Sequence, residues 1–289
     1  MRLFNRVSKL TVGTRELTGL DMQFQVKKTL KPEPNVCTIK IFNLAPDTRR
    51  AMEAGHLPGT SDPKGIPVRL EAGYQDGTSL LYFGDVRTVQ TDTNGADVVT
   101  EISSGDGEKA FGTARVYIPV GPRTPPDMAM RAIIRALGVG VGNQEKALIT
   151  LRQKGVASIF SRRVIVGSAA AALTLMCRSA DLEWSIQDGN VQILDRGKAL
   201  DGQAVLLASG ANTKGPLAIA TNTGLVGSPA VDNKGIVSAT CLMIPDLRPG
   251  VKVVFDTRSV TGGYRVIEVD YEGDTQGEAW FAKIKAEKY

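Results

Sequence analysis

The chain has 289 residues, of which 42% are hydrophobic and 22% charged, and its formal net charge is +5. This composition is ordinary for a folded protein, and the length leaves room for two or three domains. No apolar run approaches the roughly 20 residues that cross a bilayer, and the N-terminus has no apolar stretch typical of a signal peptide. We therefore expect a protein made and kept in the cytoplasm, with no stable membrane insertion.

The first part of the chain has the pattern of a β domain. Apolar and polar residues alternate over residues 20–26 and again over 37–41, which predicts two half-buried strands. Residues 43–52 predict a short helix with Asn43 near its N-cap. A β-meander follows, so we place a mostly β domain at residues 1–115.

The middle of the chain changes to helical periodicity. One helix is expected to begin at a Thr124 cap, with proline at its first position, and to end at Gly138. A second helix is expected over residues 168–180, and a hairpin with an Asp188-Gly189 turn follows it. Together these elements predict a compact α+β lobe at residues 116–200, inserted between two β regions.

Residues 201–289 return to β signals and repeat the meander of the first domain. The matching positions are Gly65 and Gly250, the pairs Val86 with Val89 and Val266 with Val269, and the third strands Gly95–Ile102 and Gly277–Ile284. The repeat predicts two related β domains on one chain. The alternative is that any two meanders look alike, because strand alternation and turn glycines recur everywhere. The final strand, from residue 280, either pairs internally or offers an edge to a partner.

The residues that usually carry chemistry are few and isolated. His56 is the single histidine, and the chain has no Gly-x-Ser-x-Gly elbow. Cys37, Cys177 and Cys241 lie far apart in apolar stretches and form no Cys-x-x-Cys pair, so we expect buried, reduced thiols and no zinc site. We also expect that no activity depends on His56 or on any cysteine.

Other motifs favour structure over binding. The glycines at 138–142 follow a helix and precede no Gly-Lys-Ser/Thr, which predicts a helix stop and a flexible link. Residues 105–107 and 272–274 lack the spacing of a calcium loop and are expected to be turns. Paired carboxylates for glycoside cleavage stay open, because the fold sets their separation. With scattered basic residues and 6% aromatics, a solvated surface is favoured over a nucleic-acid groove. The sequence thus predicts no catalytic, cofactor-binding or metal-binding residue.

Four stretches in a shared order resemble the central hub proteins of phage tails and baseplates, the family that includes late control protein D. The stretches are Ile39–Arg49, with its Asn-Leu-Ala-Pro-Asp-Thr-Arg segment; Tyr82–Val86, followed by Val98–Ile102 and Gly105-Asp-Gly; Thr223–Pro229, with Gly-Leu-Val-Gly-Ser-Pro; and Leu247–Gly250, followed by Tyr264-Arg-Val and Gly273–Trp280. Together they span nearly the whole chain.

The resemblance implies a mainly β fold with an α+β insertion, in which two tail-tube-like β-barrels, 1–115 and 201–289, flank the lobe at 116–200. It implies a structural virion protein rather than an enzyme, located in the tail or baseplate after synthesis in the host cytoplasm. The expected partners are two further copies in a homotrimer, the tail tube protein, the tail spike or tip protein and the tape measure protein. DNA is expected only in transit through the lumen of a pseudo-sixfold collar, and no cofactor is implied.

Two alternatives come from other classes of protein. The same barrels assembled as hexamers would suit another ring component, such as a distal-tail ring or a secretion-system or tailocin hub. The mass of the oligomer separates this alternative from a trimeric hub. A cell-wall hydrolase is the other alternative, which a peptidoglycan-release assay with a His56→Ala control would test.

Overall fold

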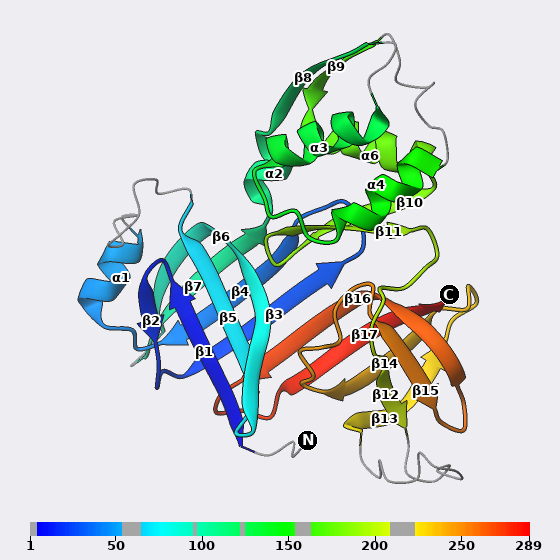
Figure 1. Ribbon diagram of the computed structural model, residues 1–289. Helices are drawn as coiled ribbons and strands as arrows, with labels where there is room; N and C mark the ends of the chain where they lie inside the picture. Colours follow the sequence, from blue (N-terminus) through cyan, green and yellow to red (C-terminus); the bar gives the residue numbers. More distant parts are fainter. Residues whose placement is uncertain (1–4, 54–64, 95–96, 122–124, 154–162, 209–222) are drawn as a thin grey trace. The chain divides into compact units, whose positions relative to one another are not determined.

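The computed structural model describes residues 5–53, 65–94, 97–121, 125–153, 163–208 and 223–289. These residues divide into two compact units (Figure 1). The first unit contains residues 1–29, 36–105 and 199–289, and the second contains 30–35 and 106–198. The mainly β fold class with an α+β part is confirmed, because one large sheet dominates the first unit and helices are concentrated in the second. The domain boundaries at 116 and 200 stay a prediction.

The described residues of the first unit form a 13-stranded sheet. Its strands are β1 Arg6–Val12, β2 Arg15–Leu17, β3 Met22–Thr29, β4 Asn35–Phe42, β5 Pro67–Tyr74, β6 Gly77–Asn94, β7 Asp97–Asp106, β12 Val205–Ala208, β13 Leu225–Val231, β14 Val237–Leu242, β15 Lys252–Asp256, β16 Thr261–Asp274 and β17 Trp280–Lys288. The strand order is β13-β14-β17-β16-β3-β4-β7-β6-β5-β1-β2, while β15 pairs with both β16 and β12. The short helix α1, Pro46–Glu53, follows β4 and buries Met52.

The two halves of this sheet repeat one strand order. The first half contains β5-β6-β7-β4-β3 and the second contains β15-β16-β17-β14-β13. A bulge interrupts the β6–β7 pairing between Val86 and Thr88, and an equivalent bulge interrupts the β16–β17 pairing between Val266 and Glu268. The valine pairs of the sequence repeat therefore occupy equivalent positions. β17 pairs internally with both β14 and β16, which decides between the two expectations for the final strand.

Alternation along the strands buries one face of the sheet in a single hydrophobic cluster. In the first half, β1 contributes Leu10, β5 contributes Leu70, and β3 and β4 contribute Phe24 and Ile39. The long strand β6 pairs with β5 through its first part and with β7 through its second. It therefore connects the layer formed by β1 and β5 to the strands β7, β4 and β3. The other face of β3, β4, β16 and β17 carries the exposed side chains.

The described residues of the second unit form four helices and two two-stranded sheets. Its elements are α2 Glu108–Gly112, β8 Arg115–Val120, α3 Pro126–Leu137, α4 Gln144–Gln153, β9 Arg163–Ser168, α6 Ala169–Ser179, β10 Leu182–Gln187 and β11 Asn190–Asp195. Its core contains Ile133, Leu173 and Trp184, and Trp184 stacks on Phe111 with ring centroids 5.5 Å apart. Asp106 is buried and accepts a hydrogen bond from the Gly189 N–H.

Several local expectations of the sequence are met and others are wrong. α6 begins at the Ser168 cap, α3 ends at Gly138 in a left-handed conformation, and β10 and β11 form the expected hairpin. Asn43 does not cap α1, because its side-chain amide instead bonds Asp97 and the Val98 N–H. Residues 138–142 are not a flexible link, because Gly140 bridges to Asn190 of β11. Residues 272–274 belong to β16 rather than to a turn.

Candidate functional site

The exposed side of β14, β17, β16, β3, β4 and β7 forms one polar surface, which we call the polar sheet face. Its residues are Ser238, Thr240, Lys283, Lys285, Glu268, Asp270, Glu272, Gln23, Gln25, Lys27, Thr38, Lys40 and Glu101. Strand periodicity produces this face, because successive side chains point to opposite sides of a sheet. Each of these polar residues alternates with a residue of the buried face.

Lysines on this face are matched by acids on neighbouring strands. Nζ of Lys283 lies 2.6 Å from Oε1 of Glu272, and Nζ of Lys285 lies 3.1 Å from Oε2 of Glu268. A looser pair joins Lys40 and Glu101 at 3.7 Å. The thirteen residues named above include four lysines and four acids, so their formal charges cancel. DNA-binding surfaces instead present lysines and arginines to neutralise phosphates, so this face is poorly suited to holding DNA.

The two halves of the sheet meet where β3 pairs antiparallel with β16, which we call the internal joint. Its register runs from Glu268 opposite Thr29 to Asp274 opposite Gln23 (Figure 1, blue strand beside orange strand). The amide of Gln25 donates to Asp270 at 3.0 Å, and the amide of Gln23 donates to Asp274 at 2.8 Å. The joint is therefore held by backbone pairing and by side-chain bonds on the polar sheet face.

An aromatic cluster closes the buried side of the internal joint. The rings of Phe24 and Trp280 meet edge to face with centroids 5.5 Å apart. A Cβ atom added to Gly273 would lie 2.1 Å from Phe24 Cζ, so only glycine lets the ring approach. The guanidinium of Arg6 lies 5.7 Å from the Trp280 ring centroid and donates to the Glu278 carbonyl. These contacts fix the two halves to each other within one chain.

Two carboxylates at the joint have shifted pKa values of opposite sign. Burial raises the pKa of Asp270, and Glu272 nearby adds to the shift while Lys27 and the Gln25 amide oppose it. Burial also opposes ionisation of Asp274, but the N–H groups of Gly277 and Gln276 outweigh it and hold its pKa below the usual value.

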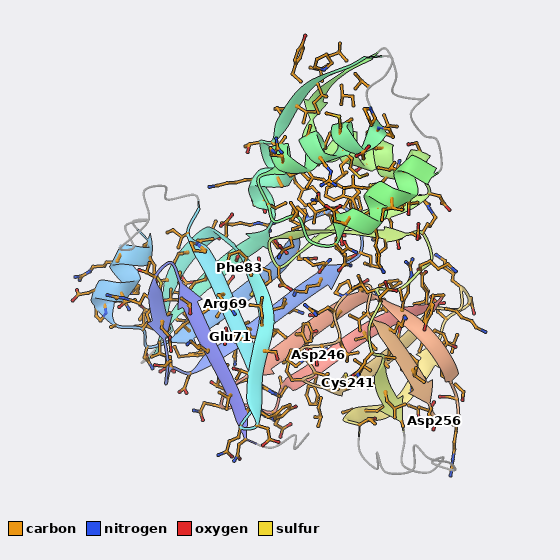
Figure 2. The ribbon with its side chains drawn as sticks, in the orientation of Figure 1. Arg69, Glu71, Phe83, Cys241, Asp246 and Asp256 are labelled. Carbon is orange, nitrogen blue, oxygen red and sulfur yellow. The ribbon has the colours of Figure 1, made fainter. Side chains whose placement is uncertain are left out.

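The described residues offer little for catalysis. They contain no group of three or more His, Cys, Asp or Glu side chains arranged to hold a metal ion. The three cysteines are buried and free, as expected, and burial raises the pKa of Cys177 and of Cys241 to about 12. Figure 2 labels Cys241 on β14. His56 lies outside the described residues.

Among the described residues of the first unit, two of the open hollows are lined by residues that could be considered for binding. One, of about 340 Å³, lies over β3, β4 and β7 on the polar sheet face, where its titratable groups are the paired Lys40 and Glu101. The other, of about 410 Å³, is lined by residues 200–205, Val251 and Lys252, together with Asp246 and Arg248; Figure 2 labels Asp246. Neither lining contains histidine or cysteine, so neither offers the nucleophile–base pair of acyl-transfer enzymes.

Comparison with protein families decides what this architecture is. The model of the family described as baseplate hub gp41 matches residues 7–286. The chain belongs to this family. It is therefore a phage tail hub protein that associates with other tail components. Comparison with the curated proteins gives no match.

Solved structures share the fold of this hub. The tail protein of Neisseria meningitidis MC58 is 10% identical with a TM-score of 0.61, and the match covers 99% of this chain and 97% of that one. The 43 kDa tail protein of prophage MuSo2 from Shewanella oneidensis is 10% identical with a TM-score of 0.60, over 97% and 96%. The Escherichia coli c3393 protein, a component of the type VI secretion system, is 9% identical with a TM-score of 0.57, over 97% and 77%.

Sequence reasoning found the repeat of the hub but missed its internal joint. The alternation at residues 20–26 and 280–286 predicted strands with one polar side, and those sides lie on the polar sheet face. The pairing of β3 with β16 joins residues far apart in the chain, and no local pattern marks such a partner. Gly273 within a strand was the one available signal, because a strand glycine often marks a close approach.

No helix among the described residues is both long enough and apolar enough to cross a membrane.

Proposed function

We propose that three copies of this hub form a ring with near-sixfold geometry, which joins the sixfold tail tube to a threefold spike and lets DNA pass. The repeated strand order supports this proposal most directly. Each chain holds two halves that repeat one strand order and share the bulge of their long strands, side by side in one sheet. One such chain imitates two neighbouring subunits of a sixfold ring, so three chains supply six similar units while keeping threefold symmetry.

The dimensions of such a ring suit DNA passage. Each chain contributes eight adjacent strands, from β13 through β17 and β3 to β6. Three chains would give 24 strands, and at about 4.8 Å per strand the backbone circle is roughly 37 Å across before side chains are counted. That circle leaves room for a DNA duplex.

The layering of the sheet favours one orientation in the ring. The outer layers, β1 with β5 and β12 with β15, belong to the hydrophobic cluster that covers the buried face. The bulkier side of a closed ring lies outside, where the circumference is larger, so the polar sheet face turns toward the axis. Its paired lysines leave little free positive charge to retain phosphates, which suits a passage rather than a binding site.

The electron density of assembled tails, with the copies counted at the hub level, tests this proposal. We expect three chains, two similar units per chain and the polar sheet face lining the lumen. Six chains at this level would replace the trimeric hub with a hexameric ring component. A channel lined by the β1–β5 layer would reverse the orientation. A spike-like or lysozyme activity is not part of the proposal, and purified hub should release no peptidoglycan fragments.

A further inference from the structure

Both strands of the internal joint have counterparts elsewhere in the same sheet, one at its end and one in the part of β6 that continues beyond the pairing with β5. By strand order, β13 in the second half corresponds to β3 in the first, and β6 corresponds to β16. Among the described residues, β13 has a strand neighbour only in β14, and residues 88–94 of β6 pair only with β7. Each chain therefore has two strand edges without a described strand neighbour, and these edges correspond to the two sides of the internal joint.

The correspondence of β13 with β3 extends to single hydrogen bonds. The Phe42 N–H donates to the Asp21 carbonyl at 3.0 Å where β4 meets β3, and the Leu242 N–H donates to the Gly224 carbonyl at 2.7 Å where β14 meets β13. At the far end of the strands, Val231 lies opposite Val237 of β14 as Val26 lies opposite Cys37 of β4. Between these ends β13 carries a bulge that β3 lacks.

The correspondence of β6 with β16 is fixed by their shared bulge. Thr88 and Glu268 are the first paired residues after the bulge, so residues 88–94 correspond one by one to residues 268–274. In the internal joint, residues 268–274 are the segment that pairs with β3. Their counterparts in β6 include Thr88, Gln90 and Asp92, all of which are exposed.

A valine of β13 is exposed at a position where its counterpart on β3 is buried. Val26 of β3 is 0% exposed, whereas its counterpart Val231 is 53% exposed. An apolar side chain is thus left in solvent at a position where the internal joint buries one. Exposed single valines are common on protein surfaces, so this observation counts only together with the matching edges.

We propose that β13 of one chain pairs antiparallel with residues 88–94 of β6 in the next copy, in the register of the internal joint. Asp92 of the next copy then lies opposite Ala230 of the first chain, as Glu272 lies opposite Gln25, and Thr91 of the next copy lies opposite Val231 of the first chain. The contact is head to tail, so repetition closes a ring in which joints within chains and between chains alternate. The proposal rests on the proposed function, which supplies the closed ring.

Disulfide cross-linking in assembled tails tests this pairing. The double variant Asp92→Cys with Ala230→Cys serves as the only hub in tail particles, which are oxidised and run on a non-reducing gel. Within one chain the two positions are seven strand spacings apart, roughly 34 Å, so no intramolecular bridge forms. The native cysteines are buried and stay out of the reaction. We expect a ladder that ends at three cross-linked chains and disappears on reduction.

Matched variants decide between a specific joint and chance contact. Each single cysteine variant should give no ladder. Asp92→Cys with Ser238→Cys should give at least tenfold less cross-linked product than Asp92→Cys with Ala230→Cys, because Ser238 lies on β14, one strand further from the edge. Thr91→Cys with Val231→Cys keeps the proposed register on the opposite face and should form the ladder, which covers the case in which the first pair fails to assemble.

The outcomes separate this inference from the proposed function. A ladder ending at three supports both, and a ladder continuing to six supports the strand joint while overturning the trimeric hub. A threefold ring in the density without cross-links from either pair overturns the strand joint and leaves the trimer intact. Equal ladders from the Ser238 pair and the Ala230 pair would also overturn the proposed register.

Discussion

The internal joint and the outer edges of the sheet share a strand order but differ in chemistry. Inside the chain, the unbroken strand β3 presents Phe24 to Gly273 and Trp280. At the outer edge, the corresponding part of β13 is a bulge that contains Gly227 and Pro229, and the free part of β6 carries polar residues. A joint that forms during folding can contain aromatic residues. An edge that stays exposed to solvent before assembly needs features that prevent pairing with the wrong chain.

The largest expected effect comes from removing the aromatic ring of the internal joint. Phe24→Ala should lower the free energy of unfolding by about 3–5 kcal/mol, because it empties a buried site beside Trp280. Urea titration of the purified chain measures it. Phe83→Ala is the matched control at the half-buried Phe83 on β6, which Figure 2 labels, and it should cost clearly less. Equal losses of unfolding free energy would show that Phe24 at the internal joint contributes no more to stability than Phe83.

Substitution by alanine should have different effects on stability at equivalent positions of the long strands β16 and β6. Gly273→Ala should cost about 1–3 kcal/mol, because the new Cβ would press into the Phe24 ring. Thr93→Ala at the corresponding position of β6 should stay within about 0.5 kcal/mol, since Thr93 is exposed. Thermal unfolding of both variants checks the difference. An unchanged melting temperature for Gly273→Ala would mean that the strands at the joint separate easily.

An outer-edge substitution should affect assembly without affecting the chain itself. Val231→Glu leaves the free energy of unfolding within about 0.5 kcal/mol, because the side chain is exposed. In the ring it would bury a charge, so we expect at least a tenfold loss of incorporation into tails, which corresponds to about 1.4 kcal/mol. Quantitative immunoblots of purified particles measure it. Val226→Glu, on the opposite face of β13, should incorporate normally, and a similar loss for both variants would argue against a buried site at Val231.

The smallest expected effect depends on pH. The pKa of Asp270 is raised by burial, so its ionised form destabilises the fold at high pH, and this cost shrinks as pH falls through the raised pKa and is gone below the ordinary pKa of an aspartate. Asp270→Asn should stabilise the chain at pH 7 by less than about 1 kcal/mol, because solvent screens a partly exposed carboxylate, and the gain should shrink as pH falls toward the ordinary pKa of an aspartate. Urea titrations across this range measure the gain.

Asp274 gives the control of opposite sign, since its lowered pKa means that its charge stabilises the fold above the ordinary pKa. Asp274→Asn should destabilise the chain at pH 7, and this loss should shrink as pH falls through the folded pKa. Stabilisation by both substitutions would show that the two pKa shifts do not govern stability at the joint.

Local signals in the sequence were sufficient for most single elements. Ser168 ends a β segment and precedes a run of alanines, and it caps α6 as its residue type favours. The repeat was visible because the valines of each copy flank the same bulge. Long-range pairing was not accessible, because β3 would look the same with any neighbour. Asn43 was misassigned because asparagine serves caps and left-handed positions alike, and here it has a positive φ.

The covalent link between the two halves also bears on how a tail could start to assemble. Six separate subunits need five association events to close a ring, whereas three chains with preformed internal joints need two. Each avoided event spares an estimated 4–15 kcal/mol of lost translational and rotational freedom. A hub chain that already contains half of the joints can therefore close the proposed ring at a low subunit concentration.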